Sequence, residues 1–190
     1  VHRAPSATLL TTGSELMDVG DSLLPGKIHD SNRLVLKELL QRSGAILCDL
    51  GTMADDPEAL KETMHSGSSD LLVISGGVSV GKYDYVKDVL RSLGMKTIFW
   101  RVNMRPGKPI LFGQLGRQWV FGLPGNPVSC VVGFLIFVRT AVQKMMGIEH
   151  PRLPMVKAVL QKGVSKQDGR RHYLTAILEV RDGQWVVTPT

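Results

Sequence analysis

The chain has 190 residues, of which 43% are hydrophobic and 21% are charged, and its formal net charge is +6. This composition is typical of a globular protein, and the longest apolar run, residues 130–138, has about half the length that a membrane-spanning helix needs. The positive balance favours an anionic partner, but the basic residues are scattered and lack an aromatic stacking motif, so we expect a small charged ligand and no nucleic acid.

Cysteine usage indicates the compartment. The two cysteines, Cys48 and Cys130, lie far apart and form no Cys-x-x-Cys pair. This argues against a disulfide framework and a thiolate metal site, and it favours a reducing compartment. No signal-peptide pattern is present, so we expect a cytoplasmic protein in which both cysteines are buried as small hydrophobic residues. Because the chain begins with Val1, we also expect it to be part of a longer protein.

Strands and helices are predicted to alternate along most of the chain. Apolar runs predict strands at residues 8–12, 45–50, 71–74, 97–102, 110–112 and 119–121. Helices are predicted to begin after a cap at Asp30 or Ser31, after Asp56 with Pro57 at the first helical position, and near Val86. A fourth helix of about 20 residues is predicted to follow the cap Asn126.

Alternating elements with short connections predict an α/β fold with three layers, in which helices cover both faces of a mostly parallel sheet. Ligands of such folds bind beyond the carboxyl ends of the strands. Three glycine-containing turns are expected there, at residues 11–16, 75–84 and 122–129. Their convergence would place Thr12, Gly13, Gly125 and Asn126 around one ligand.

The character of the sequence changes after Gly147. Residues 151–154 read as a linker, and strands without helices are predicted at 155–160, 173–180 and 185–187. Asp182-Gly183 suits a tight hairpin turn. We therefore divide the chain into an α/β domain at 1–150 and an incomplete small β domain at 151–190.

The turn that follows the strand at 71–74 is rich in glycine. It contains the candidate anion-binding residues Ser75, Gly76, Gly77, Ser79 and Gly81. Glycines let the backbone approach a phosphate closely, and the helix that follows offers free N–H groups. The spacing matches neither the dinucleotide fingerprint nor the Walker loop, so a tight strand–helix connection remains the alternative interpretation.

Four acids, Glu15, Asp55, Asp56 and Asp84, lie in or near the predicted turns. Asp56 is expected to cap a helix, and Asp84 alone would also be read as a residue at a helix end. Glu15 and Asp84 nevertheless both lie at carboxyl-end turns, where two carboxylates could hold Mg²⁺ beside substrate phosphates, with Asp55 as a possible third ligand.

Arg105 and Lys108 flank a stiff Pro-Gly turn. Cations on a rigid turn suit an oxyanion, because little entropy is lost when the ligand arrives, although a solvated basic pair is the alternative. Ser129 falls on the first turn of the long helix, where its hydroxyl could also hold an anion.

Six motifs in order closely resemble those of the molybdopterin molybdenumtransferases, the family of bacterial MoeA, its plant homologue and the E domain of gephyrin. They are Thr12–Leu16, Asp30–Arg33, Asp55–Pro57, Ser75–Tyr85, Arg105–Pro109 and Gly122–Ser129. The resemblance is strongest over residues 8–147. It implies that molybdopterin, in its phosphate-bearing or adenylylated form, and molybdate are substrates, that Mg²⁺ assists nucleotide cleavage, and that molybdenum then enters the dithiolene.

The resemblance also implies roles for individual residues. The acids Glu15, Asp55 or Asp56, and Asp84 match acids implicated in activity or in handling metal and nucleotide. The residues that match the proposed molybdate pocket are Ser79, Arg105, Lys108, Pro109, Ser129 and, by a looser alignment, Arg170. Two positions depart from the family: Ser14 stands where Asp is usual, and Arg105 often appears as Lys in relatives.

Two further expectations follow from the resemblance. The family's larger chains are elongated homodimers, so a homodimer or higher homo-oligomer is expected, with the adenylyltransferase that makes the intermediate as a possible partner. Two alternative functions remain open, namely that adenylyltransferase itself or a non-catalytic scaffold like gephyrin. AMP release, ATP consumption and capture of a receptor peptide would separate the three.

Overall fold

A computed structural model describes residues 2–65, 69–78, 85–165 and 168–190. Its main element is a six-stranded sheet with the strand order β4-β1-β5-β9-β8-β6. The strands are β1 Ser6–Thr12, β4 Ile46–Met53, β5 Leu71–Ser75, β6 Lys96–Trp100, β8 Leu111–Leu115 and β9 Gln118–Leu123. Strands β4, β1, β5 and β9 pair in parallel, and β8 runs antiparallel to β9 and β6, so the predicted mostly parallel sheet is confirmed.

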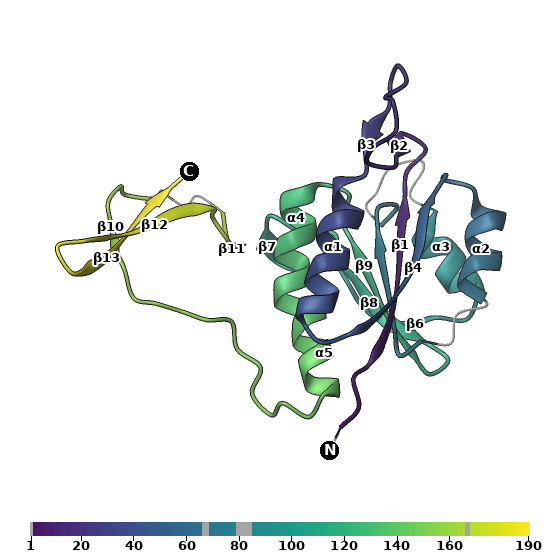
Figure 1. Cartoon of the computed structure of the whole chain (residues 1–190). Coiled ribbons are helices and arrows are strands. Elements are labelled where there is room, and N and C mark those ends of the chain that lie inside the picture. Colours follow the sequence, from purple (N-terminus) through teal and green to yellow (C-terminus); the bar gives the residue numbers. More distant parts are fainter. Residues whose placement is uncertain (1, 66–68, 79–84, 166–167) are drawn as a thin grey trace.

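Helices cover both faces of this sheet, as predicted (Figure 1). One face carries α1 Ser31–Arg42 and a long helix made of α4 Pro127–Gly133, the π-helical segment η1 Phe134–Val138 and α5 Arg139–Met145. The other face carries α2 Pro57–His65 and α3 Val86–Ser92. The sheet with its helices forms the three layers that the alternation of elements predicts.

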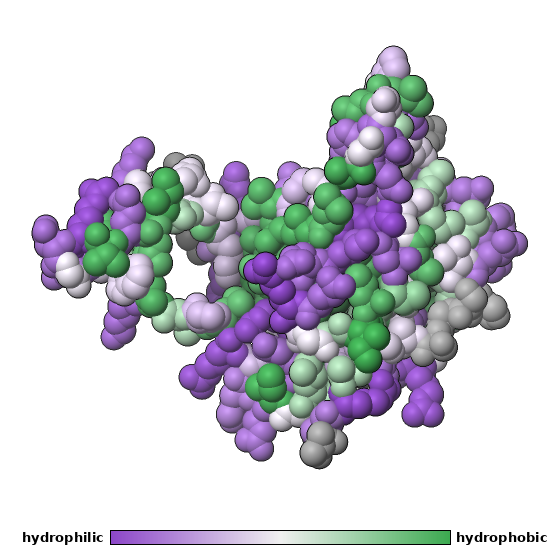
Figure 2. All heavy atoms as spheres, viewed as in Figure 1, coloured by the Kyte–Doolittle hydropathy of each residue, from purple (hydrophilic) through white to green (hydrophobic). Residues whose placement is uncertain are grey.

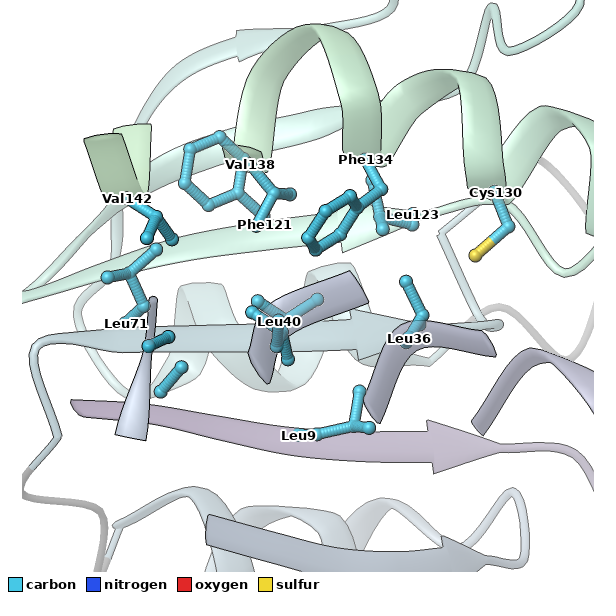
Figure 3. Close-up of a cluster of buried hydrophobic side chains, with 13 residues drawn as sticks. Leu9, Leu36, Leu40, Leu71, Phe121, Leu123, Cys130, Phe134, Val138 and Val142 are labelled. Carbon is cyan, nitrogen blue, oxygen red and sulfur yellow. The ribbon is translucent and has the colours of Figure 1, made fainter. Parts of the chain in front are cut away.

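The sheet has a hydrophobic core on each side. Successive strand side chains point to opposite faces, so Leu9 packs beneath α1 while Leu10 packs beneath α2 and α3. Figure 3 shows the cluster on the face that carries α1 and the long helix. There Leu36, Phe134 and Val138 from the helices meet side chains of the strands. Because β4, β1, β5 and β9 run in parallel, their carboxyl ends lie at one edge of the sheet.

The predicted helix caps are present. The Asp30 carboxylate accepts a hydrogen bond from the Arg33 backbone N–H at 2.9 Å, and the Asp56 carboxylate accepts one from Glu58 at 3.0 Å. The Asn126 side chain accepts one from the Ser129 N–H at 3.1 Å, with Pro127 at the first helical position. Each cap fixes a helix start at the ligand-binding edge of the sheet.

The long helix from Pro127 to Met145 has the length and apolar composition of a membrane span. A single helix of this kind is weak evidence for a membrane protein, because core helices of globular proteins have the same composition. Phe134, Val138 and Val142 are fully buried against the sheet, as a core helix requires. Its π-helical segment, Phe134–Val138, has no signature in the sequence pattern.

The two cysteines are free thiols, as predicted, but they differ in burial. Cys130 is buried on α4, whereas Cys48 is exposed, so the expectation that both are buried is wrong for Cys48. Cys48 lies on β4, the edge strand of the sheet, where Ile46 and Leu50 are also exposed. The apolar run at residues 45–50 does not reveal that one face of an edge strand lacks a covering helix.

A short arm projects from the sheet between β1 and α1. It consists of β2 Leu16–Met17 and β3 Ile28–His29, which pair in parallel, and the loop that joins them. None of the strands predicted from the sequence falls in this stretch. Figure 2 shows apolar residues on the arm, and the exposed ones are Val19, Leu23, Leu24 and Ile28.

The C-terminal residues form a separate three-stranded sheet in the order β10-β13-β12 (Figure 1). Its strands are β10 Val159–Leu160, β12 Ala176–Arg181 and β13 Gln184–Pro189. Asp182 and Gly183 have φ values of 48° and 76°, which fit the predicted two-residue hairpin turn. A further strand, β11 Arg171–His172, pairs in parallel with β7 Met104–Arg105 and so ties this unit to the α/β part.

Candidate functional site

A cleft of about 350 Å³ opens at the carboxyl edge of the parallel strands. It lies where the turns after β1, β5 and β9 meet, as the glycine-containing turns predicted. The residues that line it are Thr12, Gly13, Glu15, Leu16, Ile28, Asp30, Asn32, Asp55, Ser75, Gly76, Gly77, Val78 and Gly125. Eight of the predicted site residues therefore lie together: Thr12, Gly13, Glu15, Asp55, Ser75, Gly76, Gly77 and Gly125.

The turn after β5 requires glycine for its packing. Gly76 has a φ of +98°, and a Cβ atom there would lie 2.2 Å from the Thr12 carbonyl oxygen. Gly77 has a φ of +61°, and a Cβ atom would lie 2.6 Å from Val86 Cγ2. Both glycines are thus needed for a close strand–helix connection, and the same connection forms one wall of the cleft. The tight strand–helix connection is therefore present, and anion binding at this turn stays a prediction.

Asn32, on the first turn of α1, joins two walls of the cleft. Its side-chain amide donates to the Ser75 hydroxyl oxygen at 3.0 Å and to the Gly125 carbonyl oxygen at 2.7 Å. Ser75 ends β5 and Gly125 follows β9, so one amide fixes the spacing of two adjacent turns. A side chain held in this way makes the cleft a preformed feature of the fold.

Behind the cleft wall, Asp30 is buried and fully engaged. One carboxylate oxygen accepts from the Thr52 hydroxyl at 2.8 Å and from the Thr11 hydroxyl, and the other accepts from the Arg33 N–H. These contacts tie α1 to β1 and β4. We therefore assign Asp30 a structural role at the base of the site.

Two acids are better placed to meet a ligand. Asp55 accepts a hydrogen bond from the Ser14 N–H at 3.1 Å, and its own N–H donates to the Ser14 hydroxyl at 3.2 Å. Glu15 lines the same cleft, and its carboxylate folds over Gly13. Asp56 instead uses its carboxylate to cap α2 and is absent from the cleft lining.

The remaining residues of the glycine-rich turn, Ser79, Gly81 and Asp84, lie outside the described residues. The predicted Glu15–Asp84 metal pair is therefore untested. Within residues 2–65, 69–78, 85–165 and 168–190, no cluster of three or more acidic, histidine or cysteine side chains could hold a metal ion.

A buried hydroxyl and a buried thiol lie beside the glycine turn. The Thr12 hydroxyl has no hydrogen-bond partner among the residues that the structure describes. Cys130 Sγ lies 3.7 Å from the Ser75 hydroxyl oxygen. Burial raises the pKa of the Cys130 thiol to about 12, so this cysteine is protonated at neutral pH and does not act as a nucleophile.

The basic turn lies outside the cleft lining. Arg105 and Lys108 are exposed, and neither they nor Pro109, Asn126, Ser129 and Arg170 line the cleft. The turn is nevertheless close to it, because a Cβ atom on Gly107 would lie 3.4 Å from the Ser129 carbonyl oxygen. Ser129 is in turn bonded through both its N–H and its hydroxyl to Asn126, the neighbour of Gly125.

Arg170 lies beside the same turn, because β11 pairs with β7. The Tyr173 N–H donates to the Arg105 carbonyl oxygen at 2.8 Å, and the Arg171 N–H donates to that of Asn103 at 3.0 Å. The Arg170 guanidinium is paired with the Asp168 carboxylate, with Nε at 2.7 Å. The structure thus gathers Arg105 and Arg170 from positions 65 residues apart, and it places Lys108 in the adjacent turn.

Sequence reasoning did not identify five cleft residues as site residues: Leu16, Ile28, Asp30, Asn32 and Val78. For Asp30 and Asn32 a signal was present, since both lie in a motif at a predicted helix start. Leu16 and Ile28 face the cleft because the arm strands pair, and their spacing in the sequence does not indicate this pairing.

Residues 9–144 match the protein family described as "Probable molybdopterin binding domain". The chain is 37% identical over 172 residues to the molybdopterin molybdenumtransferase of Haemophilus influenzae, covering 89% of this chain and 42% of that protein. It is 38% identical over 189 residues to that of Nostoc sp., covering 96% of this chain and 43% of that protein.

A solved structure of the molybdopterin biosynthesis MoeA protein of Pyrococcus horikoshii is also similar. It superposes with a TM-score of 0.84 at 29% identity, over 98% of this chain and 45% of that one. The chain therefore spans less than half the length of each of these three relatives.

Proposed function

Since this chain belongs to the MoeA family of molybdopterin-binding domains, we propose that it binds molybdopterin, in its phosphate-bearing or adenylylated form, within a molybdopterin molybdenumtransferase. In that role it would help to insert molybdenum from molybdate into the dithiolene while the adenylyl group is hydrolysed. The observation that carries the proposal is the cleft where the turns after β1, β5 and β9 meet.

The chemistry of the cleft suits a phosphate-bearing pterin. Leu16, Ile28 and Val78 supply apolar surface, while the Ser75 hydroxyl and the backbone of the glycine turn supply polar groups. A cleft with apolar walls and a few convergent polar groups is the usual form of a small-molecule site. Asn32 keeps the turn after β5 against the turn after β9, so binding requires little reorganisation.

The donor set at the rim fits a magnesium ion. Mg²⁺ is usually held by one or two carboxylates together with substrate phosphates. Glu15 and Asp55 supply such oxygen donors in the cleft, and Asp84 is retained as a further proposed ligand. When bound, the ion would neutralise charge on the phosphoanhydride. Ser14 would hold the Asp55 carboxylate in place through the Ser14 N–H.

We propose that the turn at 105–109 binds molybdate. Arg105 and Lys108 are exposed and lie on a turn that packs against Ser129 at the start of α4. That position is continuous with the cleft through Asn126 and Gly125, so a bound oxyanion would approach a ligand in the cleft. The role of these residues would be proximity, which converts an encounter of two solutes into a reaction within one complex.

The oligomeric state and location belong to the same proposal. We propose a cytoplasmic homodimer or higher homo-oligomer that receives its substrate from an adenylyltransferase. Exposed apolar residues on the arm and on the C-terminal sheet offer contact surface. The two free thiols suit a reducing compartment. We also propose a boundary near residue 150 between an α/β domain and a β domain.

A single assay separates the proposed function from its rivals. The chain, and a longer protein that contains it, would be incubated with adenylylated molybdopterin, Mg²⁺ and molybdate. We expect the chain to bind the pterin and the longer protein to release AMP and incorporate molybdenum. ATP consumption with molybdopterin that lacks the nucleotide would support an adenylyltransferase instead. Absence of pterin binding by the chain would overturn the proposal.

A further inference from the structure

The β7–β11 pair presents two basic side chains, Arg105 and His172, on one face. Arg105 and His172 are register partners in this parallel pair, so their side chains share a face. The preceding partners, Met104 and Arg171, point to the other face, and Met104 is buried. Opposite Met104, the second face carries Arg105, which is exposed, and His172, whose side chain is 17% exposed. We call it the ribbon face.

Asp168 brings a further cation to the ribbon face. One of its carboxylate oxygens lies 2.5 Å from His172 Nε2, and the other accepts from Arg170 Nε at 2.7 Å and from a terminal guanidinium nitrogen. Asp168 therefore holds Arg170 beside His172. A guanidinium carries five N–H donors, so Arg170 retains three for another acceptor.

The free ring nitrogen of His172 decides what this face can bind. Nε2 faces the Asp168 carboxylate, which requires a hydrogen on Nε2, so Nδ1 is an acceptor in the neutral ring. Among the described residues, His172 Nδ1 has no hydrogen-bond partner. Protonation converts Nδ1 from an acceptor, which repels an oxyanion, into a donor, which attracts one.

The other charged groups at the ribbon face are fixed in sign near neutral pH. They are Asp168 and Arg170 from the segment before β11, Arg105 from β7 and Lys108 from the turn that follows it. Hydrogen bonds from Arg170 lower the pKa of the Asp168 carboxyl to about 2, so this carboxylate stays ionised. His172 is the group among them that can change its charge.

We propose that His172 is an additional ligand for the oxyanion at the ribbon face, and that protonation of its ring strengthens the binding of a tetrahedral dianion. The inference rests on the proposed molybdate site and adds a pH-dependent donor to it. Asp168 is the positioning residue, because it fixes the ring orientation that leaves Nδ1 free.

The test is a calorimetric titration of the 190-residue chain with molybdate and, separately, with sulfate at about pH 5.5 and about pH 7.5, the range in which histidine usually titrates. Sulfate is included because it keeps its charge over this range. The variant His172→Gln retains a side-chain amide but cannot be protonated. His150→Gln is the matched control, because His150 is exposed and lies outside the ribbon face.

We expect the wild-type chain and His150→Gln to bind both anions about fivefold more tightly at the lower pH, as one added charge in a solvated site predicts. His172→Gln should show no such gain between the higher and the lower pH. A gain that persists in His172→Gln would overturn the inference alone, provided that Arg105→Ala weakens binding. No anion binding by the wild type at either pH would overturn both the inference and the proposed molybdate site.

Discussion

The side-chain amide of Asn32 donates to the carbonyl oxygen of Gly125 at 2.7 Å, across the mouth of the cleft. Asn32 belongs to α1 and Gly125 follows β9, so this bond joins elements that are 93 residues apart. The same amide also donates to Ser75 at the end of β5. Asn32 therefore helps to set the width of the proposed pterin site.

Replacing Asn32 should affect ligand binding more than a surface change on the same helix. Asn32→Ala removes two hydrogen bonds, so we expect a loss of unfolding free energy of about 1–2 kcal/mol and molybdopterin affinity about tenfold weaker. Glu38→Ala is the control, because Glu38 pairs with Arg42 on the exposed side of α1. Calorimetry and urea unfolding measure both effects. Unchanged affinity in Asn32→Ala would reduce Asn32 to a purely structural contact.

The glycine turn should tolerate no side chain at Gly76. In Gly76→Ala, the new Cβ atom would meet the Thr12 carbonyl oxygen at 2.2 Å in addition to the strain of a positive φ. We expect a loss of about 3 kcal/mol or more in unfolding free energy, measured by urea denaturation.

Gly20→Ala is the matched control for Gly76→Ala. Gly20 has a similar φ of +108°, but no atom lies within 4 Å of the position that a Cβ atom would take there. It should lose about 1 kcal/mol, the cost of backbone strain alone. Equal losses in the two variants would show that close packing against Thr12 does not limit the turn.

Acid should weaken the attachment of α1 to β4 through Asp49. Burial raises the pKa of the Asp49 carboxyl, but hydrogen bonds from Arg33 and Lys37 outweigh burial and lower it to about 2. A lowered folded-state pKa stabilises the fold above the ordinary value of 3.8, and this stabilisation is lost as pH falls towards 2.

The variant Asp49→Asn tests this pH dependence. We expect it to be about 2 kcal/mol less stable than the wild type at neutral pH, with the difference shrinking below about pH 4. Asp88→Asn is the control, because Asp88 is exposed and its ion pair with Arg91 is long, at 3.7 Å. Urea unfolding over a range of pH gives the comparison. A wild-type advantage over Asp49→Asn that stayed constant with pH would contradict the assignment.

The neighbouring acids Asp55 and Asp56 should differ in their contribution to Mg²⁺ binding. Asp55→Asn keeps an oxygen that can accept from the Ser14 N–H but removes the charge, so stability should change by less than about 0.5 kcal/mol. We expect Mg²⁺ binding in the presence of molybdopterin to weaken about tenfold. Asp56→Asn should leave it unchanged, because Asp56 caps α2 outside the cleft. Identical magnesium titrations for the two variants would rule out Asp55 as a ligand.

The local features of the fold were predictable because their causes are local. The apolar run at residues 71–74 predicted the strand β5. Asn126 was recognised as the cap of the long helix, and the cap of α1 was narrowed to Asp30 or Ser31. Cys48 was misassigned, because its exposure depends on β4 being an edge strand. Strand order is a property of the whole sheet and leaves no mark on one segment.

The candidate site was predictable in part for the same reason. Carboxyl-end turns converge in any parallel sheet, so Thr12, Ser75 and Gly125 could be grouped from the order of elements alone. The contact of Asn32 with Gly125 and the pairing of β7 with β11 join distant segments through tertiary packing. No spacing rule relates such positions, and only the structure reveals them.

The proposal that molybdopterin occupies the cleft is tested most directly by a variant that obstructs the cleft without disturbing the fold. Gly125 lies at the cleft wall, has no positive φ, and a Cβ atom there would meet only Gly76 Cα, at an ordinary 3.9 Å. Gly163→Leu is the matched control in the C-terminal region. Among the described residues, no atom lies within 4 Å of the position that a Cβ atom would take at Gly163.

The measurement is the dissociation constant of molybdopterin for Gly125→Leu, Gly163→Leu and the wild-type chain, determined by calorimetry alongside thermal unfolding. We expect Gly125→Leu to unfold like the wild type but to bind molybdopterin at least about tenfold more weakly, while Gly163→Leu binds normally. Wild-type affinity in a folded Gly125→Leu variant would show that molybdopterin does not occupy this cleft.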